Sequence, residues 1–302
     1  TADADERRST PPVGCSAVGG TEAVTIEIGE LTFDAAVAGS PDDPVVILLH
    51  GFPQTGWCWR HQIADLVAGG YRVIAPDQRG YSPGARPRAV GDYTNGHLVA
   101  DALGFIDWAG VERVHLVGHD WGATVAWQVA GRHGDRLHSV TPISVPHPRA
   151  YTASLQNPDS DQRGRSWYFA WFAEPGVEEQ FLADDASQLR SVYTATGLSA
   201  EEADTYVARL GSPEALGAAL QWYRASGVDL LDGLGPVTVP TMHIWSTDDL
   251  ALGPEAAHAT GDHVDGPYRF EILEGVGHWI PELAPAACSA LLLDHFAQAG
   301  GT

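Results

Sequence analysis

Short runs of apolar and β-branched residues recur along the chain and predict the strands of a buried sheet. They cover residues 44–49, 111–117, 239–245 and 268–273. Runs of this length with few polar positions are typical of strands in the interior of a sheet. Residues 123–133 follow the second run and have the pattern of a helix. Strands that alternate with helices predict an α/β protein with a mostly parallel sheet.

The alternation of strands and helices stops at residue 147 and resumes near residue 233. We interpret residues 147–233 as a helical cap that divides the core into two parts, 21–146 and 234–302. Residues 1–20 are polar and contain proline and glycine, which is the composition of an extension without core partners.

The segment 118–122 reads Gly-His-Asp-Trp-Gly and lies between a predicted strand and a predicted helix. This is the glycine spacing of a strand-to-helix elbow, in which the chain turns sharply and exposes the central side chain. Here the central residue is Asp120 in place of a serine. A carboxylate is already ionised at pH 7 and can displace at saturated carbon, so Asp120 is a candidate nucleophile.

Aspartate before a helix is also a common N-cap, because its carboxylate accepts backbone N–H bonds there. That alternative gives no role to His-Gly-Phe-Pro at 50–53, or to His278 in the segment 275–279. A nucleophile gives both a role, since acyl chemistry needs donors for an oxyanion and a base. The whole constellation therefore favours a nucleophilic Asp120 over a cap.

Two neighbouring aspartates, Asp248 and Asp249, follow the predicted strand at 239–245, and His278 follows the strand at 268–273. The chain order is thus nucleophile, acid and histidine, as in α/β-hydrolases. Either aspartate could instead cap the next helix.

Other histidines, including His50, His119 and His147, are expected to make structural hydrogen bonds.

Four motifs together resemble those of the α/β-hydrolase superfamily and, within it, the epoxide hydrolases of soluble type. They are His-Gly-Phe-Pro at 50–53, Asp-Gln-Arg-Gly-Tyr-Ser at 77–82, Gly-His-Asp-Trp-Gly at 118–122 and Gly-Val-Gly-His-Trp at 275–279. The resemblance runs from about residue 25 to residue 296. It implies an α/β-hydrolase core with a mostly parallel central sheet flanked by helices, and a helical cap inserted after the sixth core strand.

The resemblance also implies roles for particular residues. Asp120 is the nucleophile, His278 the base and Asp249 the acid, since the family's spacing after the strand favours Asp249 over Asp248. Backbone N–H groups of Phe52 and Trp121 are the implied oxyanion donors.

Two cap segments, 167–176 and 220–224, resemble those that carry epoxide-polarising tyrosines, which here are Tyr168 and Tyr223. Phenols can donate to the epoxide oxygen as it leaves. Plain core packing is the alternative for a tyrosine in so aromatic a segment. The aromatic density predicts an apolar or aromatic substrate. The expected substrate-binding residues are Trp167, Phe169, Trp171 and Trp222.

The implied reaction opens an epoxide to a vicinal diol through a covalent Asp120 ester, which water activated by His278 then hydrolyses, with no cofactor and no metal. A haloalkane dehalogenase could use the same three residues with Trp121 on the halide, although Phe52 supplies no second donor. A fluoroacetate dehalogenase is disfavoured, since residues 121–124 contain no arginine. A non-catalytic ligand-binding protein of this fold is the third alternative.

The composition narrows these possibilities further. All 17 basic residues are arginines, and the formal net charge is −22 over 302 residues. Without a lysine the chain cannot form a Schiff base, attach pyridoxal phosphate or build a Walker phosphate loop. Its negative charge disfavours nucleic acid, anionic membranes and, at long range, anionic substrates. The expected partners are a small apolar epoxide and water.

Cys15, Cys58 and Cys288 are too few and too scattered for a disulfide framework or a zinc site, while a single bridge stays open. The sequence has no apolar run of 18 residues and no signal-peptide pattern at Thr1. We expect a cytoplasmic monomer or homodimer, and secretion with a removed leader stays open.

Overall fold

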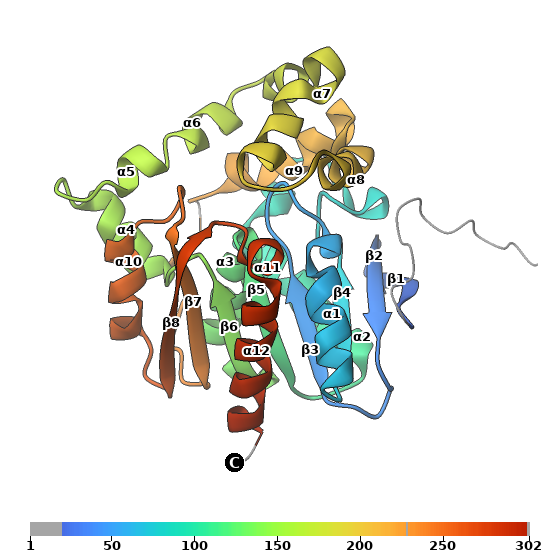
Figure 1. Ribbon diagram of the computed structural model, residues 1–302, viewed down its shortest axis with the longest axis vertical. Coiled ribbons are helices and arrows are strands. Elements are labelled where there is room, and N and C mark those ends of the chain that lie inside the picture. Colours follow the sequence, from blue (N-terminus) through green and yellow to red (C-terminus); the bar gives the residue numbers. More distant parts are fainter. Residues whose placement is uncertain (1–19, 228, 301–302) are drawn as a thin grey trace, which may run out of the picture.

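A computed structural model describes residues 20–227 and 229–300 (Figure 1). Almost all of the predicted extension 1–20, with Cys15, lies outside these residues. Within them the sheet has eight strands in the order β1-β2-β4-β3-β5-β6-β7-β8. The first two strands are antiparallel to their neighbours and the others run parallel. The strands are β1 (Glu22–Ile28), β2 (Leu31–Ala38), β3 (Val45–Leu49), β4 (Arg72–Pro76), β5 (Val114–His119), β6 (Leu137–Ile143), β7 (Thr241–Asp248) and β8 (Tyr268–Gly277).

Helices cover both faces of this sheet (Figure 1). Helix α1 packs against α12 on one side, and α2 packs against α3 on the other. The core helices are α1 (Arg60–Ala68), α2 (Asn95–Ala109), α3 (Trp121–Arg132), α10 (Pro254–Ala259), α11 (Ile280–Leu283) and α12 (Pro285–Ala299). Short 3₁₀ helices lie at Gly56–Trp59, Pro83–Ala85, Val90–Tyr93, Gly134–Arg136 and Thr260–His263. No helix in the described ranges is both long and apolar enough to span a membrane.

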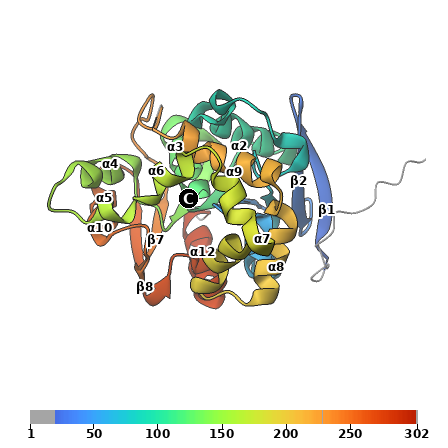
Figure 2. The same ribbon diagram turned by 90° about the horizontal axis from the view of Figure 1, so that it is seen from above.

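A set of helices lies between β6 and β7 in the chain and sits above the carboxyl ends of the strands (Figure 1). These helices are α4 (Pro148–Gln156), α5 (Gln162–Arg165), α6 (Tyr168–Ala173), α7 (Val177–Ala195), α8 (Ala200–Leu210) and α9 (Pro213–Ala225). Helix α7 is interrupted by non-helical residues at 183–186. From above, α4 and α5 lie on the side of β7 and β8, and α7 and α8 lie towards β2 (Figure 2). The expected fold class, with its helical insertion after the sixth strand, is confirmed.

The predicted strands are in the right places, but their ends differ. The run at 111–117 begins its strand only at Val114, and β8 continues past residue 273 to Gly277. Residues 274–277 include two glycines, which have low strand propensity. Gly275 has a φ of 69°, and the register of β7 with β8 shifts between Ser246 and Asp248, where Asp248 lies opposite Gly277. Glycine at residue 275 therefore supplies a left-handed conformation at an irregularity in the pairing, and that pairing carries the strand past its predicted end.

Parallel pairing brings the chemically active loops to one edge of the sheet. Every residue of β3 and β5 is buried, and Leu49 lies opposite Gly118 in the register of these two strands. The loop after β3 and the elbow after β5 are consequently neighbours. β7 and β8 also run parallel to β5 and β6, so the loops that follow them reach the same edge.

Buried and half-buried polar contacts hold α8 on the core. The Arg209 guanidinium pairs with Asp77 at 2.6 Å and also with Asp34. Glu282 accepts hydrogen bonds from Arg60 at 2.5 Å and from the Tyr206 hydroxyl at 2.8 Å. Breaking one member of such a network would leave a buried charge without its partner, which is costly. This part of the cap is therefore fixed relative to the sheet.

Candidate active site

Asp120 occupies the sharp turn between β5 and α3. Its φ of 53° lies in the left-handed region that non-glycine residues seldom adopt. A Cβ on Gly118 would overlap the backbone of Gly122, and one on Gly122 would overlap the carbonyl group of Leu49. Both flanking positions thus require glycine for the strand and the helix to pass. The Asp120 side chain makes no capping hydrogen bond to α3, so capping does not explain its presence.

The carboxylate of Asp120 points towards the loop that follows β3. Its Oδ1 atom accepts the backbone N–H of Phe52 at 2.8 Å, and a Cβ on Gly51 would overlap the carboxylate. Trp121 is the first residue of α3, and backbone N–H groups there have no partner within the helix. The structure thus brings the Phe52 N–H onto the Asp120 carboxylate, and Trp121 stays a predicted second donor at the start of α3.

His278 lies between two carboxylates. Its Nδ1 atom donates to Asp249 Oδ2 at 2.7 Å, and its Nε2 atom is 3.3 Å from Asp120 Oδ2. Asp249 is buried, and its other oxygen accepts backbone N–H groups at 2.8 and 3.0 Å in the loop that follows. Asp248 is exposed at the end of β7. Of the two aspartates that the sequence left open, the geometry thus places Asp249 next to the histidine.

Burial opposes a charge on His278, but the charge of Asp249 and the hydrogen bonds to both carboxylates raise its pKa to about 10. Burial likewise opposes a charge on Asp120, yet the hydrogen bond and the charge of His278 hold the pKa of this carboxyl below its usual value. Both shifts favour an imidazolium at His278 beside an ionised Asp120 at neutral pH.

The pH dependence of stability tests this protonation state. The pKa of His278 is raised from 6.5 to about 10 on folding, so its stabilising contribution is complete below pH 6.5 and is lost as the pH rises through 10. We expect the free energy of unfolding to fall over this range by on the order of a few kcal/mol more than in His278→Gln. The other histidines, the cysteines and the tyrosines also ionise in or near this pH range in the unfolded chain, and the comparison with His278→Gln removes the contribution that the two proteins share. Parallel urea-denaturation profiles of the two proteins against pH would contradict the assignment.

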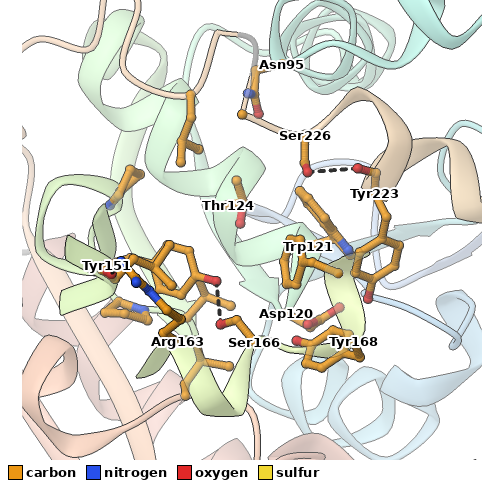
Figure 3. Close-up of a pocket in the computed structure, with 18 residues that line it drawn as sticks. Asn95, Asp120, Trp121, Thr124, Tyr151, Arg163, Ser166, Tyr168, Tyr223 and Ser226 are labelled. Atoms are coloured by element: carbon orange, nitrogen blue, oxygen red, sulfur yellow. Dashed lines mark hydrogen bonds between the residues drawn. The ribbon is translucent and has the colours of Figure 1, made fainter. Parts of the chain in front are cut away.

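A cavity of about 330 Å³ opens above Asp120 (Figure 3). Tyr168 and Tyr223 lie on the same side of it as Asp120. Burial, and after it the charge of Asp120, raise the pKa of both phenols well above the usual value, so both are protonated donors at neutral pH. The cavity is lined by Asn95, Asp120, Trp121, Thr124, Val145, Pro146, Pro148, Tyr151, Leu155, Arg163, Ser166, Tyr168, Phe169, Tyr223, Ser226, Gly227, Leu230 and Leu252.

The four aromatic residues that we expected to bind substrate differ in their position relative to the cavity. Phe169 lines the cavity, whereas Trp167, Trp171 and Trp222 are not among the described residues that line it. Trp167 is 64% exposed and stacks on Trp171, four residues further along the chain. Trp222 is buried, and its indole donates to a core carbonyl group at 2.8 Å. The structure thus brings only Phe169 of the four to the described lining of this cavity, because neighbours along a helix face different directions.

Several residues that line the cavity belong to no motif that the sequence analysis could identify. Asn95 and Thr124 come from α2 and α3, Tyr151 from α4 and Arg163 from α5. They are polar residues without a motif, and they come together only because α4 and α5 fold back over the sheet.

Helix α5 also holds the loop that carries the acid. The Gln162 side chain donates to the carbonyl of Ala251 at 2.7 Å and accepts the N–H of Gly253 at 2.8 Å. The Arg165 guanidinium donates to the carbonyl of Asp249 at 2.6 Å. The position of the acid thus depends on a helix of the cap as well as on the core.

The remaining histidines near the elbow have structural partners, as expected. His50 accepts the N–H of Gln78 at 3.0 Å, and a ring N–H of His119 donates to the carbonyl of His278 at 2.9 Å. His147 accepts a backbone N–H at the start of α4. The two cysteines within the described residues, Cys58 and Cys288, are buried and free.

Comparison with known proteins places this geometry in context. A model of the alpha/beta hydrolase fold matches residues 44–285. Epoxide hydrolase A of Mycobacterium tuberculosis is 34% identical over 296 residues, which cover 85% of this chain and 91% of that protein. The Bacillus subtilis AB hydrolase superfamily protein YfhM is 33% identical, with 91% and 98% covered. The crystal structure of Epoxide Hydrolase A from Mycobacterium thermoresistibile superposes with a TM-score of 0.80 at 30% identity, covering 91% of this chain and 98% of that one.

Proposed function

The chain belongs to the alpha/beta hydrolase fold family, and on this basis we propose that it is an epoxide hydrolase that converts an apolar or aromatic epoxide to a vicinal diol. Its similarity to epoxide hydrolases supports the reaction class. One observation carries the rest of the proposal. The ionised carboxylate of Asp120 faces a cavity from the same side as the hydroxyl-bearing rings of Tyr168 and Tyr223.

The first half-reaction forms an ester. A carboxylate oxygen of Asp120 attacks one epoxide carbon as the bond from that carbon to the ring oxygen breaks, and Tyr168 and Tyr223 donate hydrogen bonds to the departing oxygen. Burial disfavours a tyrosinate at either position. Transfer of the His278 proton to the alkoxide, directly or through a phenol, balances the charge and leaves a neutral imidazole.

The second half-reaction hydrolyses the ester. Esterification removes the negative charge of Asp120, which is one of the causes of the raised pKa of His278. The neutral imidazole takes a proton from water as the water attacks the ester carbonyl, and Asp249 stabilises the imidazolium that forms. The N–H groups of Phe52 and Trp121 hold the oxyanion. Its collapse breaks the bond between the carbonyl carbon and the alkoxide oxygen, which takes the proton from His278 and leaves as the diol, and the regenerated Asp120 carboxyl group returns a proton to His278.

An isotope experiment distinguishes this route from direct attack of water on the epoxide. With enzyme in excess over styrene oxide in ¹⁸O-labelled water, the first turnover should give an unlabelled diol, because the added oxygen comes from Asp120. The label should instead enter the Asp120 carboxyl group, which mass spectrometry of the peptide locates. A labelled diol in the first turnover would rule out the ester. Multiple turnovers are the control, since they should label the diol.

The same cavity could serve a haloalkane dehalogenase, since Trp121 lines it. The ring of Phe52 packs on Phe172 and Tyr223 and supplies no donor for a halide, which disfavours this reading. Halide release from a 1-haloalkane, without turnover of styrene oxide, would replace the epoxide proposal. Binding of both without turnover would support a non-catalytic protein.

A further inference from the structure

Three polar side chains gather on the side of the cavity opposite Trp121 and Tyr223. They are Tyr151, Arg163 and Ser166 (Figure 3). None of them has a part in the proposed ring opening or in the hydrolysis of the ester. Their available hydrogens determine what they could bind.

Tyr151 and Ser166 have one hydroxyl hydrogen more than they use. Their oxygens are 2.9 Å apart and share one hydrogen bond. The amide of Gln162 donates to the Ser166 oxygen at 3.0 Å, so this contact occupies an acceptor position and no hydrogen. Two hydroxyl groups supply two hydrogens, and one remains without an acceptor whichever oxygen donates.

Arg163 adds a positive charge to this corner. Its guanidinium donates to the carbonyl of Leu155 at 3.1 Å, which leaves most of its five N–H donors free. Among the described residues no carboxylate pairs with it, whereas the nearby Arg165 pairs with Asp161 at 2.8 Å. Within the described residues this corner therefore presents N–H and O–H donors with a cation and no carboxylate, whereas Asp120 lines another side of the same cavity.

Such a donor set matches a carboxylate. Arginine binds carboxylates through charge-assisted hydrogen bonds, and a hydroxyl group can donate to the same oxygens. Apolar side chains of Val145, Leu155 and Leu252 also line the cavity and would contact the body of a ligand. The net charge of −22 repels anions at long range, and a cation at the mouth of the cavity opposes that repulsion at contact distance.

We propose that Tyr151, Arg163 and Ser166 form a carboxylate subsite, and that the natural substrate is an epoxide with an apolar body and an acidic group at its other end. The subsite deepens the proposed epoxide hydrolase function and rests on it for the substrate class. Arg163 is then a specificity-determining residue.

Binding of a matched acid and amide tests the subsite without any turnover. We expect 4-phenylbutanoate to bind the wild-type protein about tenfold or more tightly than 4-phenylbutanamide, measured by calorimetry. Arg163→Gln should remove most of this preference and leave the affinity for the amide unchanged. Arg113→Gln is the matched control, because Arg113 is also exposed and donates to a backbone carbonyl at 3.1 Å but lies outside the cavity.

Equal affinities for acid and amide, no binding of the acid, or a preference that survives Arg163→Gln would overturn the subsite. A second arm compares kcat/KM for styrene oxides that carry a carboxylate or a carboxamide on the ring. If neither epoxide reacts while the acid preference depends on Arg163, the proposed function fails and the subsite stands. If both react equally well in wild type and Arg163→Gln, and the affinities agree, the function stands and the subsite fails.

Discussion

Replacing His278 by glutamine is expected to stop the reaction at the covalent ester. Asp120 can still open the epoxide in this variant, with the alkoxide held by Tyr168 and Tyr223 and protonated by solvent in place of His278, but no base remains to activate water. Turnover should fall by at least about 10³-fold. Intact mass after incubation with styrene oxide should rise by the mass of the whole epoxide, since ring opening loses no atoms.

Two control variants make this result specific. Asp120→Ala should gain no mass, alone or combined with His278→Gln, because the nucleophile is absent. His138→Gln changes an exposed histidine of β6 and should turn over normally without an adduct. An unchanged mass of His278→Gln, with a substrate that the wild type consumes, would rule out the ester mechanism. With a haloalkane, a gain equal to the alkyl group minus a proton would indicate dehalogenation.

Removal of both hydroxyl groups at Tyr168 and Tyr223 is expected to abolish ring opening. Each tyrosine to phenylalanine change should lower the rate of ester formation by about 10-fold to 10²-fold, and the double variant should lose about 10³-fold or more, because the alkoxide then leaves without a donor. The rings pack on each other and on Phe169 and Phe172. Phenylalanine keeps these contacts, so stability should change little.

The rate of mass gain in a His278→Gln background isolates the step that the tyrosines assist. Hydrolysis of an ester already formed, followed in proteins with an intact His278, should be much less affected. Tyr71→Phe is a suitable control, since Tyr71 packs on Phe296 and His115 outside the cavity. Ester formation at the wild-type rate in the double variant would mean that Tyr168 and Tyr223 are packing residues.

The elbow and the order of the loops could be predicted because both are local in the sequence. Gly118 is required by a close contact with the backbone of Gly122, four residues further on, while Gly122 is required by the carbonyl group of Leu49 on the neighbouring strand, and the Gly-x-Asp-x-Gly spacing still marks both in one segment. Parallel pairing then brings the end of each strand to one edge. The residues themselves left Asp248 and Asp249 open, and the spacing implied by the family resemblance favoured Asp249, which the structure places beside His278.

The walls of the cavity could not be predicted in the same way. Trp167 and Trp171 are close to Tyr168 in sequence, but they stack on each other and do not belong to the described lining of the cavity. Tyr151 and Arg163 come from elements whose approach depends on how the helical insertion folds over the sheet. A sequence motif contains residues that are close together in the chain, whereas the residues that line a cavity come from segments that are far apart in the chain.

The hold of α5 on the acid loop limits how this protein can be redesigned. Gln162 and Arg165 bind the backbone of residues 249–253. Helix α5, which contributes to the wall of the cavity, therefore also holds Asp249 in position. A chimera that takes its cap from a relative should be built with the matching acid loop from the same donor. During evolution, the two segments would be expected to change together although more than eighty residues separate them along the chain.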